Sequence, residues 1–195
     1  MKHAMRAALG GILALALAAH MPARAEEADV AALSQQAQKI LKGFAMTLKG
    51  TLVQALKSEG PVEAINVCSH KAGKIARNFS FNGWTVGRTA LKLRNPMQNS
   101  PDEWEKAVLH AFEKQIAEGA DPKTLVKAEI VEEGGKKVFR FMKAIPVGKP
   151  CLTCHGENLK PEVKEAIDAL YPDDKATGFK LGQLRGAFTL KKPLN

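Results

Sequence analysis

The chain has 195 residues, which suits one folded domain with a real hydrophobic core, and it carries a formal net charge of +9 at pH 7. Its lysines are spread along the chain rather than clustered, so the charge by itself identifies no partner. The three cysteines form an odd set in a chain too large to need a disulfide scaffold, which excludes the small disulfide-rich class.

The first 25 residues have the pattern of a secretory signal peptide. Lys2 and Arg6 precede an apolar stretch at 7–19, and Ala23-Arg24-Ala25 offers a cleavage site. The apolar stretch is shorter than the roughly 20 residues that span a bilayer, although a retained anchor is the alternative. We therefore expect a signal peptide at 1–25 and a single domain at 26–195, soluble and periplasmic or otherwise exported. The mature chain should have no transmembrane helix and no role with nucleic acid.

Two helices are predicted at the start of the mature chain. Apolar residues recur every three or four positions from 28 to 58, which is helical spacing. Gly60-Pro61 then ends one helix and starts another, which should run toward Asn82-Gly83. On this second helix Cys68 shares a face with apolar residues, so its side chain should point inward.

A strand, a loop and a third helix follow. Residues 84–89 alternate as in a strand, and the prolines and asparagines of 93–101 predict an irregular loop. Ser100 fits the N-cap of a helix with Pro101 at its first position and Glu103 three residues after the cap. Gly119 should end this helix.

The C-terminal half predicts a sheet. Residues 126–132 and 137–145 alternate around Gly134-Gly135, which is the composition of a tight hairpin. A short helix is expected at 161–170 and a last strand at 184–191. Because helices and antiparallel strands follow one another in this order, we predict an α+β fold with helices packed beside an antiparallel sheet.

The motif Cys151-Leu152-Thr153-Cys154-His155 carries the chemistry. Two cysteines at this spacing can add to the vinyl groups of a haem, and the adjacent histidine can bind its iron. A redox dithiol would be expected in a thioredoxin-like context, and zinc would need ligands beyond the scattered His70 and His110. Export agrees with haem c, because covalent attachment takes place outside the membrane. We predict one covalent haem c held by Cys151, Cys154 and His155.

The opposite side of the iron is less determined by the residues. Cys68 could be a further ligand or merely a small buried hydrophobic side chain. Methionine is the common partner of histidine in electron-carrying cytochromes c, which makes Met46, Met97 and Met142 alternatives. Met97 is the main rival because it lies in the loop beside Pro96, whereas Met46 is expected in the core. Arg88, Arg94 and Arg185 could pair with the haem propionates.

Several blocks of the sequence carry a family resemblance. They are 64–68, 84–89, 93–96, 99–105, 151–156 and 182–187. In this order they resemble the PAS-like haem c sensor domains, long catalogued as a domain of unknown function, over nearly the whole mature chain. The resemblance implies a PAS-like central antiparallel sheet with long N-terminal helices and a haem whose iron is bound by His155 and Cys68. It also favours Arg88 and Arg94 for the propionates.

Two functions follow from a single haem. The chain could be a redox or gas sensor that acts through a protein partner, or it could carry electrons between proteins. Catalysis would need distal residues that handle protons, and the spacing of His70 and His110 turns both away from the expected site. We therefore expect a binding protein rather than an enzyme. The redox or signalling partner is not identified by the residues.

Overall fold

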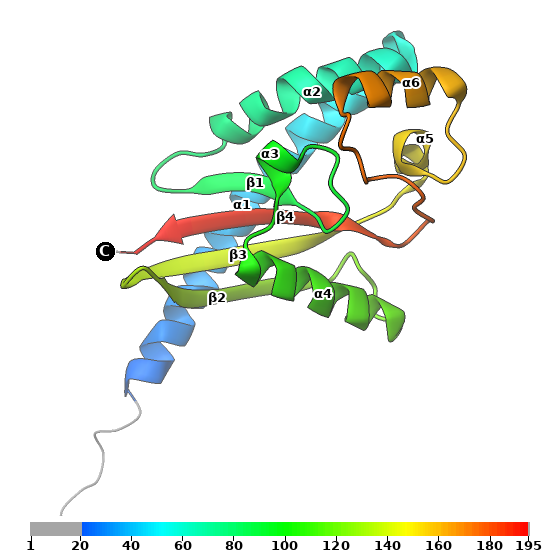
Figure 1. Cartoon of the computed structure of the whole chain (residues 1–195). Coiled ribbons are helices and arrows are strands. Elements are labelled where there is room, and N and C mark those ends of the chain that lie inside the picture. The colour runs from blue at the N-terminus through cyan, green and yellow to red at the C-terminus, as the bar shows by residue number, and fades with distance from the viewer. Residues whose placement is uncertain (1–20, 195) are drawn as a thin grey trace, which may run out of the picture.

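The computed structural model describes residues 21–194, and the predicted signal segment lies mostly outside this range. Its helices and strands are interspersed along the chain (Figure 1). The helices are α1 (Met21–Ser58), α2 (Gly60–Asn78), α3 (Pro96–Asn99), α4 (Glu103–Ala117), the 3-10 turn η1 (Lys149–Cys151), α5 (Leu152–His155) and α6 (Pro161–Leu170). The strands are β1 (Thr85–Thr89), β2 (Val126–Glu133), β3 (Lys136–Pro146) and β4 (Leu184–Pro193).

The strands form one antiparallel sheet in the order β1-β4-β3-β2. The β2–β3 hairpin turns at Gly134 and Gly135, which both have the positive φ that a two-residue turn of this kind requires. The final strand returns between β1 and β3, so it joins the hairpin to the rest of the sheet. The predicted α+β fold with a PAS-like central antiparallel sheet and long N-terminal helices is confirmed.

Helices cover both faces of the sheet (Figure 1). On one face, α1 buries Ala37, Leu41 and Phe44 against Phe139, Phe141 and other inward residues of the sheet. On the opposite face, α4 packs Val108, Leu109 and Phe112 against residues such as Met142. Each large side chain buried in this way contributes about 1.5–3 kcal/mol to stability. The period-2 alternation of β3 supplies both cores, because Phe139 and Phe141 face one way and Met142 faces the other.

The start of α4 differs from the prediction. Ser100 is not its N-cap; the cap is Asp102, whose carboxylate accepts from the Glu105 amide at 2.9 Å while Glu105 accepts from the Asp102 amide at 3.1 Å. This reciprocal capping box satisfies two free helix donors, so it outcompetes the Ser100–Glu103 alternative. The helix therefore begins two residues later than Pro101. The predicted loop at 93–101 also contains the short helix α3.

Two further elements frame one end of the sheet. Helix α2 packs along α1 and also contacts α6 and α5. The segment that leads from α6 to β4 descends beside α5 toward the sheet (Figure 1). The end of β3, α5, α2 and this segment therefore meet in one place, where the sequence motif lies. None of the helices within residues 21–194 is sufficiently long and apolar to cross a membrane.

Candidate functional site

The motif follows directly from the sheet. Strand β3 ends at Pro146, and pairing with the β4 side continues through the Val147 amide, which donates to the Gln183 carbonyl at 2.8 Å. Cys151 ends η1, while Cys154 and His155 belong to α5. Gly156 closes this turn, because a Cβ at that position would lie 2.6 Å from the Leu152 carbonyl oxygen. The sheet thus presents the motif as a compact helical turn at its edge.

The two motif cysteines face different apolar clusters and are both half-buried. Cys151 packs with Val147, Ala176 and Phe179. Cys154 packs in a cluster that includes Ile65 of α2. The motif therefore lies between the segment after α6 on one side and α2 on the other.

The His155 ring has a defined orientation. Its Nδ1 lies 2.6 Å from the Ala176 carbonyl oxygen, and its ring packs edge-on against Phe179 at 6.4 Å between centroids. Burial, together with the charges of Arg185 and Arg94, lowers the pKa of His155 to about 2. The ring is therefore neutral, and since a carbonyl only accepts, Nδ1 carries the proton. Nε2 is left with a free lone pair, as a metal ligand needs.

Cys68 is brought to the same place from a separate element. It lies on α2 one turn after Ile65, and it is half-buried. Burial raises the pKa of the Cys68 thiol, while the charges of Arg88 and Arg94 act to lower it. The charge of Cys68 in turn acts to raise the pKa of Cys154. The three cysteines of the sequence therefore surround one location. A thiol in this environment stays protonated unless a metal ion stabilises its anion.

Tyr171 is a site residue that the sequence reasoning missed. This buried residue, the only tyrosine of the sequence, lies in the same cluster as Ile65 and Cys154. Burial raises the pKa of Tyr171, and the adjacent Cys68 raises it further. Its place just after α6 gave no periodic signal, because the tertiary packing of α6 on α2 creates the contact.

The predicted propionate-binding arginines differ from one another. Arg94 is occupied: its Nε and Nη2 pair with Asp174 at 3.1 and 3.2 Å, and Nη2 also donates to the Cys154 carbonyl at 2.6 Å. Arg88 and Arg185 have no ion pair in the part of the chain that the structure describes. Burial lowers the pKa of Arg88, and burial with the charges of Arg94 and Arg88 lowers the pKa of Arg185 to about 10.

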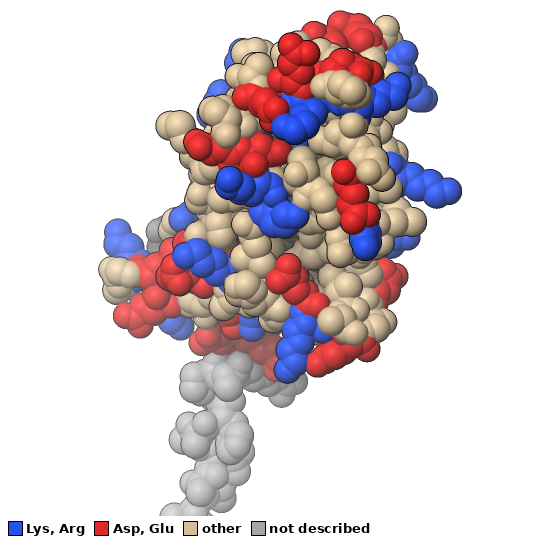
Figure 2. All heavy atoms as spheres, turned by 45° about the vertical axis from the view of Figure 1, so that its right-hand side comes forward, with Lys and Arg blue, Asp and Glu red and all other residues tan. Residues whose placement is uncertain are grey.

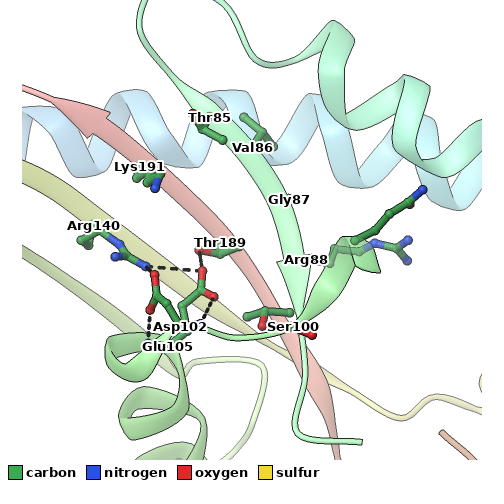
Figure 3. Close-up of a pocket in the computed structure, with 12 residues that line it drawn as sticks. Thr85, Val86, Gly87, Arg88, Ser100, Asp102, Glu105, Arg140, Thr189 and Lys191 are labelled. Carbon is green, nitrogen blue, oxygen red and sulfur yellow. Dashed lines mark hydrogen bonds and ion pairs between the residues drawn. The ribbon is translucent and has the colours of Figure 1, made fainter. Parts of the chain in front are cut away.

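These two arginines approach the site from neighbouring strands. Arg88 of β1 opens on a cavity of about 210 Å³ between α2 and α3, and Figure 3 shows its guanidinium directed away from Asp102 and Glu105. Arg185 of β4 lies 5.4 Å from the centre of the Phe179 ring that supports His155. Cations held near one another without acidic partners favour an anionic ligand at this location.

The alternative ligands lie elsewhere. Met97 is 98% exposed, and Met46, which we expected in the core, is 65% exposed. Met142 is fully buried in the core under α4. His70 and His110 are both exposed, as their spacing suggested. Of the candidate second ligands, only Cys68 lies near Arg88 and Arg94, the arginines that also act on the pKa of His155.

A second polar cluster lies on the opposite face of the sheet, under the start of α4 (Figure 3). The buried Arg140 pairs with Asp102 at 2.7 Å and with Glu133, and it lies 4.5 Å above the Trp104 ring. Glu105 accepts from Thr189 at 2.6 Å. A cavity of about 350 Å³ adjoins these groups. Because the charges pair with each other, we assign this cluster to holding α4 on the sheet.

The comparisons agree with the fold. A family model described as Tll0287-like matches residues 18–193. Among solved structures, one described as the crystal structure of the cyanobacterial haem protein Tll0287 matches with a TM-score of 0.61 and 25% identity, over 83% of this chain and 96% of that chain. No curated protein matches the chain significantly. Since the family model covers most of its length, the chain belongs to the Tll0287-like family.

Proposed function

We propose that the chain is an exported monohaem c-type cytochrome that senses redox state or a gas. The observation that carries this proposal is the convergence of the motif turn, with Cys151, Cys154 and His155, and of Cys68 on α2. Arg88 and Arg185, which have no ion pair among the described residues, lie beside them. The solved relative's description as a haem protein supports the same cofactor. A porphyrin supplies four of the six ligands of its iron, so one histidine and one cysteine would complete the set.

The residues present fit a covalent haem. Cys151 and Cys154 would form the two thioethers, and the Nε2 of His155 would bind the iron. Arg88 and Arg185 would bind the propionates, and the cavity beside Arg88 leaves room for an anionic group. Arg94, which we expected in this role, is instead bound to Asp174.

Cys68 would be the sixth ligand. The bound group would supply an iron with a higher affinity for a thiolate when ferric than when ferrous. Cys68 holds its proton in the absence of metal because it is buried, so its binding and release would depend on the metal. Its helix α2 packs on α1 and α6, which gives a change at Cys68 a route to the rest of the fold.

The processing and location of the protein are proposed from the sequence. We propose that residues 26–195 form one domain, released after Ala25 and soluble in the periplasm, which acts through a redox or signalling partner rather than as an enzyme. The intact mass of the exported protein tests the cleavage. A mass that begins at Met1 would show a retained segment and would also weaken the case for haem c.

Absorption spectra test the cofactor. Protein produced with a haem c maturation system should keep its haem in acid-acetone and give a pyridine spectrum typical of two thioethers. The purified protein should show low-spin ferric bands with thiolate character and a different ligand state after reduction. Haem-free protein from such a culture would contradict the proposal.

An electron carrier is the alternative. The observation in its favour is that Thr153 is exposed and the motif cysteines are half-buried, so part of the bound group would be close to solvent. Figure 2, however, shows lysines, arginines and acidic residues interspersed on the face that comes forward, without a large patch of one sign. Unchanged ligation through a full redox cycle would favour the carrier, and a ligand change at Cys68 favours the sensor.

A further inference from the structure

The pair Arg94–Asp174 has no role in the function proposed so far, although it is one of the most buried ion pairs of the described chain. The side chains of Arg94 and Asp174 are 12% and 7% exposed. Both atoms of the carboxylate are used, because Oδ1 and Oδ2 accept from the Nε and Nη2 of Arg94. Such a two-point pair fixes the guanidinium plane as well as its charge.

The same pair fixes the carbonyl group that orients His155. Asp174 Oδ1 also accepts from the Ala176 amide at 2.9 Å, which sets the backbone of Ala176. Arg94 Nη2 lies 3.4 Å from the Ala176 carbonyl oxygen, and that oxygen accepts from His155 Nδ1 at 2.6 Å. A chain of contacts therefore leads from Asp174 through Ala176 to the imidazole ring.

Arg94 reaches the motif by a second route. Its Nη2 donates to the carbonyl of Cys154, the residue directly before His155. The segment that carries Arg94 is further tied to the segment of Asp174, because the Lys175 amide donates to the Leu93 carbonyl at 2.7 Å and Lys92 donates to the Thr177 carbonyl. Both the backbone before the ring and the acceptor opposite the ring are thus held by one guanidinium.

We propose that Arg94 and Asp174 are positioning residues that fix the plane and the hydrogen bond of the His155 imidazole. The proposal rests on the proposed function in that the ring would be an iron ligand. In a histidine that binds a metal, the other ring nitrogen usually donates a hydrogen bond. The acceptor of that bond sets the orientation of the ring and its electron donation to the metal. Arg94 acts here through the geometry of its fork, so lysine, which keeps the charge, does not replace it.

Two variants separate geometry from charge. Arg94→Lys keeps the positive charge and loses the fork, and Asp174→Asn removes the anion. In haem-loaded protein, both should convert the single ferric low-spin electron paramagnetic resonance signal of the wild type into a broadened or multiple signal, and Asp174→Asn should also raise the potential. Asp174→Glu should restore most of the single species.

The controls lie on other parts of the fold. Asp168→Asn breaks the exposed Lys164–Asp168 pair on α6, and Asp102→Asn weakens the Arg140 cluster on the opposite face. Both should keep the wild-type signal, the second even if the protein melts at a lower temperature. One unchanged ferric species in Arg94→Lys and Asp174→Asn would overturn the proposal. A raised potential in Asp174→Asn would not rescue the proposal in that case, because the lost charge alone explains that shift.

A wild-type protein without haem would contradict the proposed function and not this inference. In that case the ¹⁵N chemical shifts of the His155 ring test the positioning role of Arg94. The wild type should show a ring protonated at Nδ1 alone, and Arg94→Lys should show a mixture of the two tautomers. An unmixed Nδ1 tautomer in Arg94→Lys would overturn the positioning role.

Discussion

The two sides of the candidate site are built differently. His155 is held by a hydrogen bond to Ala176 and by an aromatic contact with Phe179. Around Cys68, by contrast, the described hydrogen bonds of α2 side chains are local, such as Ser69 to the Asn66 carbonyl and Asn66 to Glu63. Cys68 is therefore positioned by the packing of its helix, whereas His155 is positioned by directed bonds.

Under the proposed ligation, this difference predicts which of the two residues is fixed and which can leave. Directed hydrogen bonds among buried groups are costly to break, since each unpaired partner retains its desolvation penalty. Apolar packing allows small shifts of a helix at lower cost, because its contacts have no preferred direction. We infer that His155 keeps its position through a change of state, and that a change at Cys68 is expressed as movement of α2.

Removal of the attachment should have the largest effect. The double substitution Cys151→Ala and Cys154→Ala removes both thioethers, so the protein should lose all acid-stable haem. Acid-acetone extraction and the pyridine spectrum measure this loss. A double variant that retained acid-stable haem would show that Cys151 and Cys154 do not attach the haem.

Substitution of Cys68 should alter one side of the site alone. Cys68→Ala should lose the low-spin ferric signature of thiolate ligation and raise the potential by on the order of 100 mV, because axial ligands tune haem potentials over about 0.8 V. Electron paramagnetic resonance and redox titration measure the change. Met97→Ala is the matched control, since the Met97 side chain is exposed and should change neither quantity. The reverse result would transfer the ligand role to Met97.

The two unpaired arginines should have a smaller effect. Arg185→Gln and Arg88→Gln each remove a positive charge beside the site, which favours the ferric state and should lower the potential by roughly a few tens of millivolts. Among the charged groups, Arg185 has the largest effect on the pKa of His155, and Arg88 has the largest effect on the pKa of Cys68. If neither variant shifts the potential, the propionates are bound elsewhere.

The cluster around Arg140 should affect stability without affecting either ligand. Arg140→Met leaves Asp102, Glu105 and Glu133 without their cation, which should lower the free energy of unfolding by about 3 kcal/mol. Urea unfolding measures the loss, and the haem spectrum should stay unchanged. A shifted spectrum would mean that the two faces of the sheet are coupled more tightly than their separate cores indicate.

The smallest expected effect concerns pH. Although burial opposes it, hydrogen bonds from the Glu105 amide and Arg140 lower the pKa of Asp102 below its usual value. The unfolded chain then binds more protons than the folded one, so this contribution is present above about pH 4 and is lost as the pH falls through the folded pKa. Asp102→Asn should therefore reduce stability at neutral pH and have little effect in acid. Because Asp102 is half-exposed, screening should keep the loss below about 1 kcal/mol.

Local pattern determined much of this protein. The hairpin at Gly134-Gly135, helix α6 at 161–170 and the final strand were all predicted from periodicity and turn residues. These features depend on neighbours a few residues apart, which the sequence displays directly. The motif at 151–155 was likewise recognised from its spacing, which predicts covalent attachment of a haem.

Tertiary structure decided what the local pattern left open. The N-cap moved from Ser100 to Asp102, where a reciprocal pair forms and Arg140 adds a third bond. Arg94 and Arg185 were both candidates for the propionates, and the family resemblance favoured Arg94, yet Arg94 meets Asp174, eighty residues away, and Arg185 meets no acid within the described chain. The sequence left Cys68 either a ligand candidate or a plain buried residue, and the packing of α2 on α5 brings it to the motif turn. Partners that distant along the chain leave no periodic trace, so only the folded structure determines which arginine pairs with a carboxylate and which does not within the described residues.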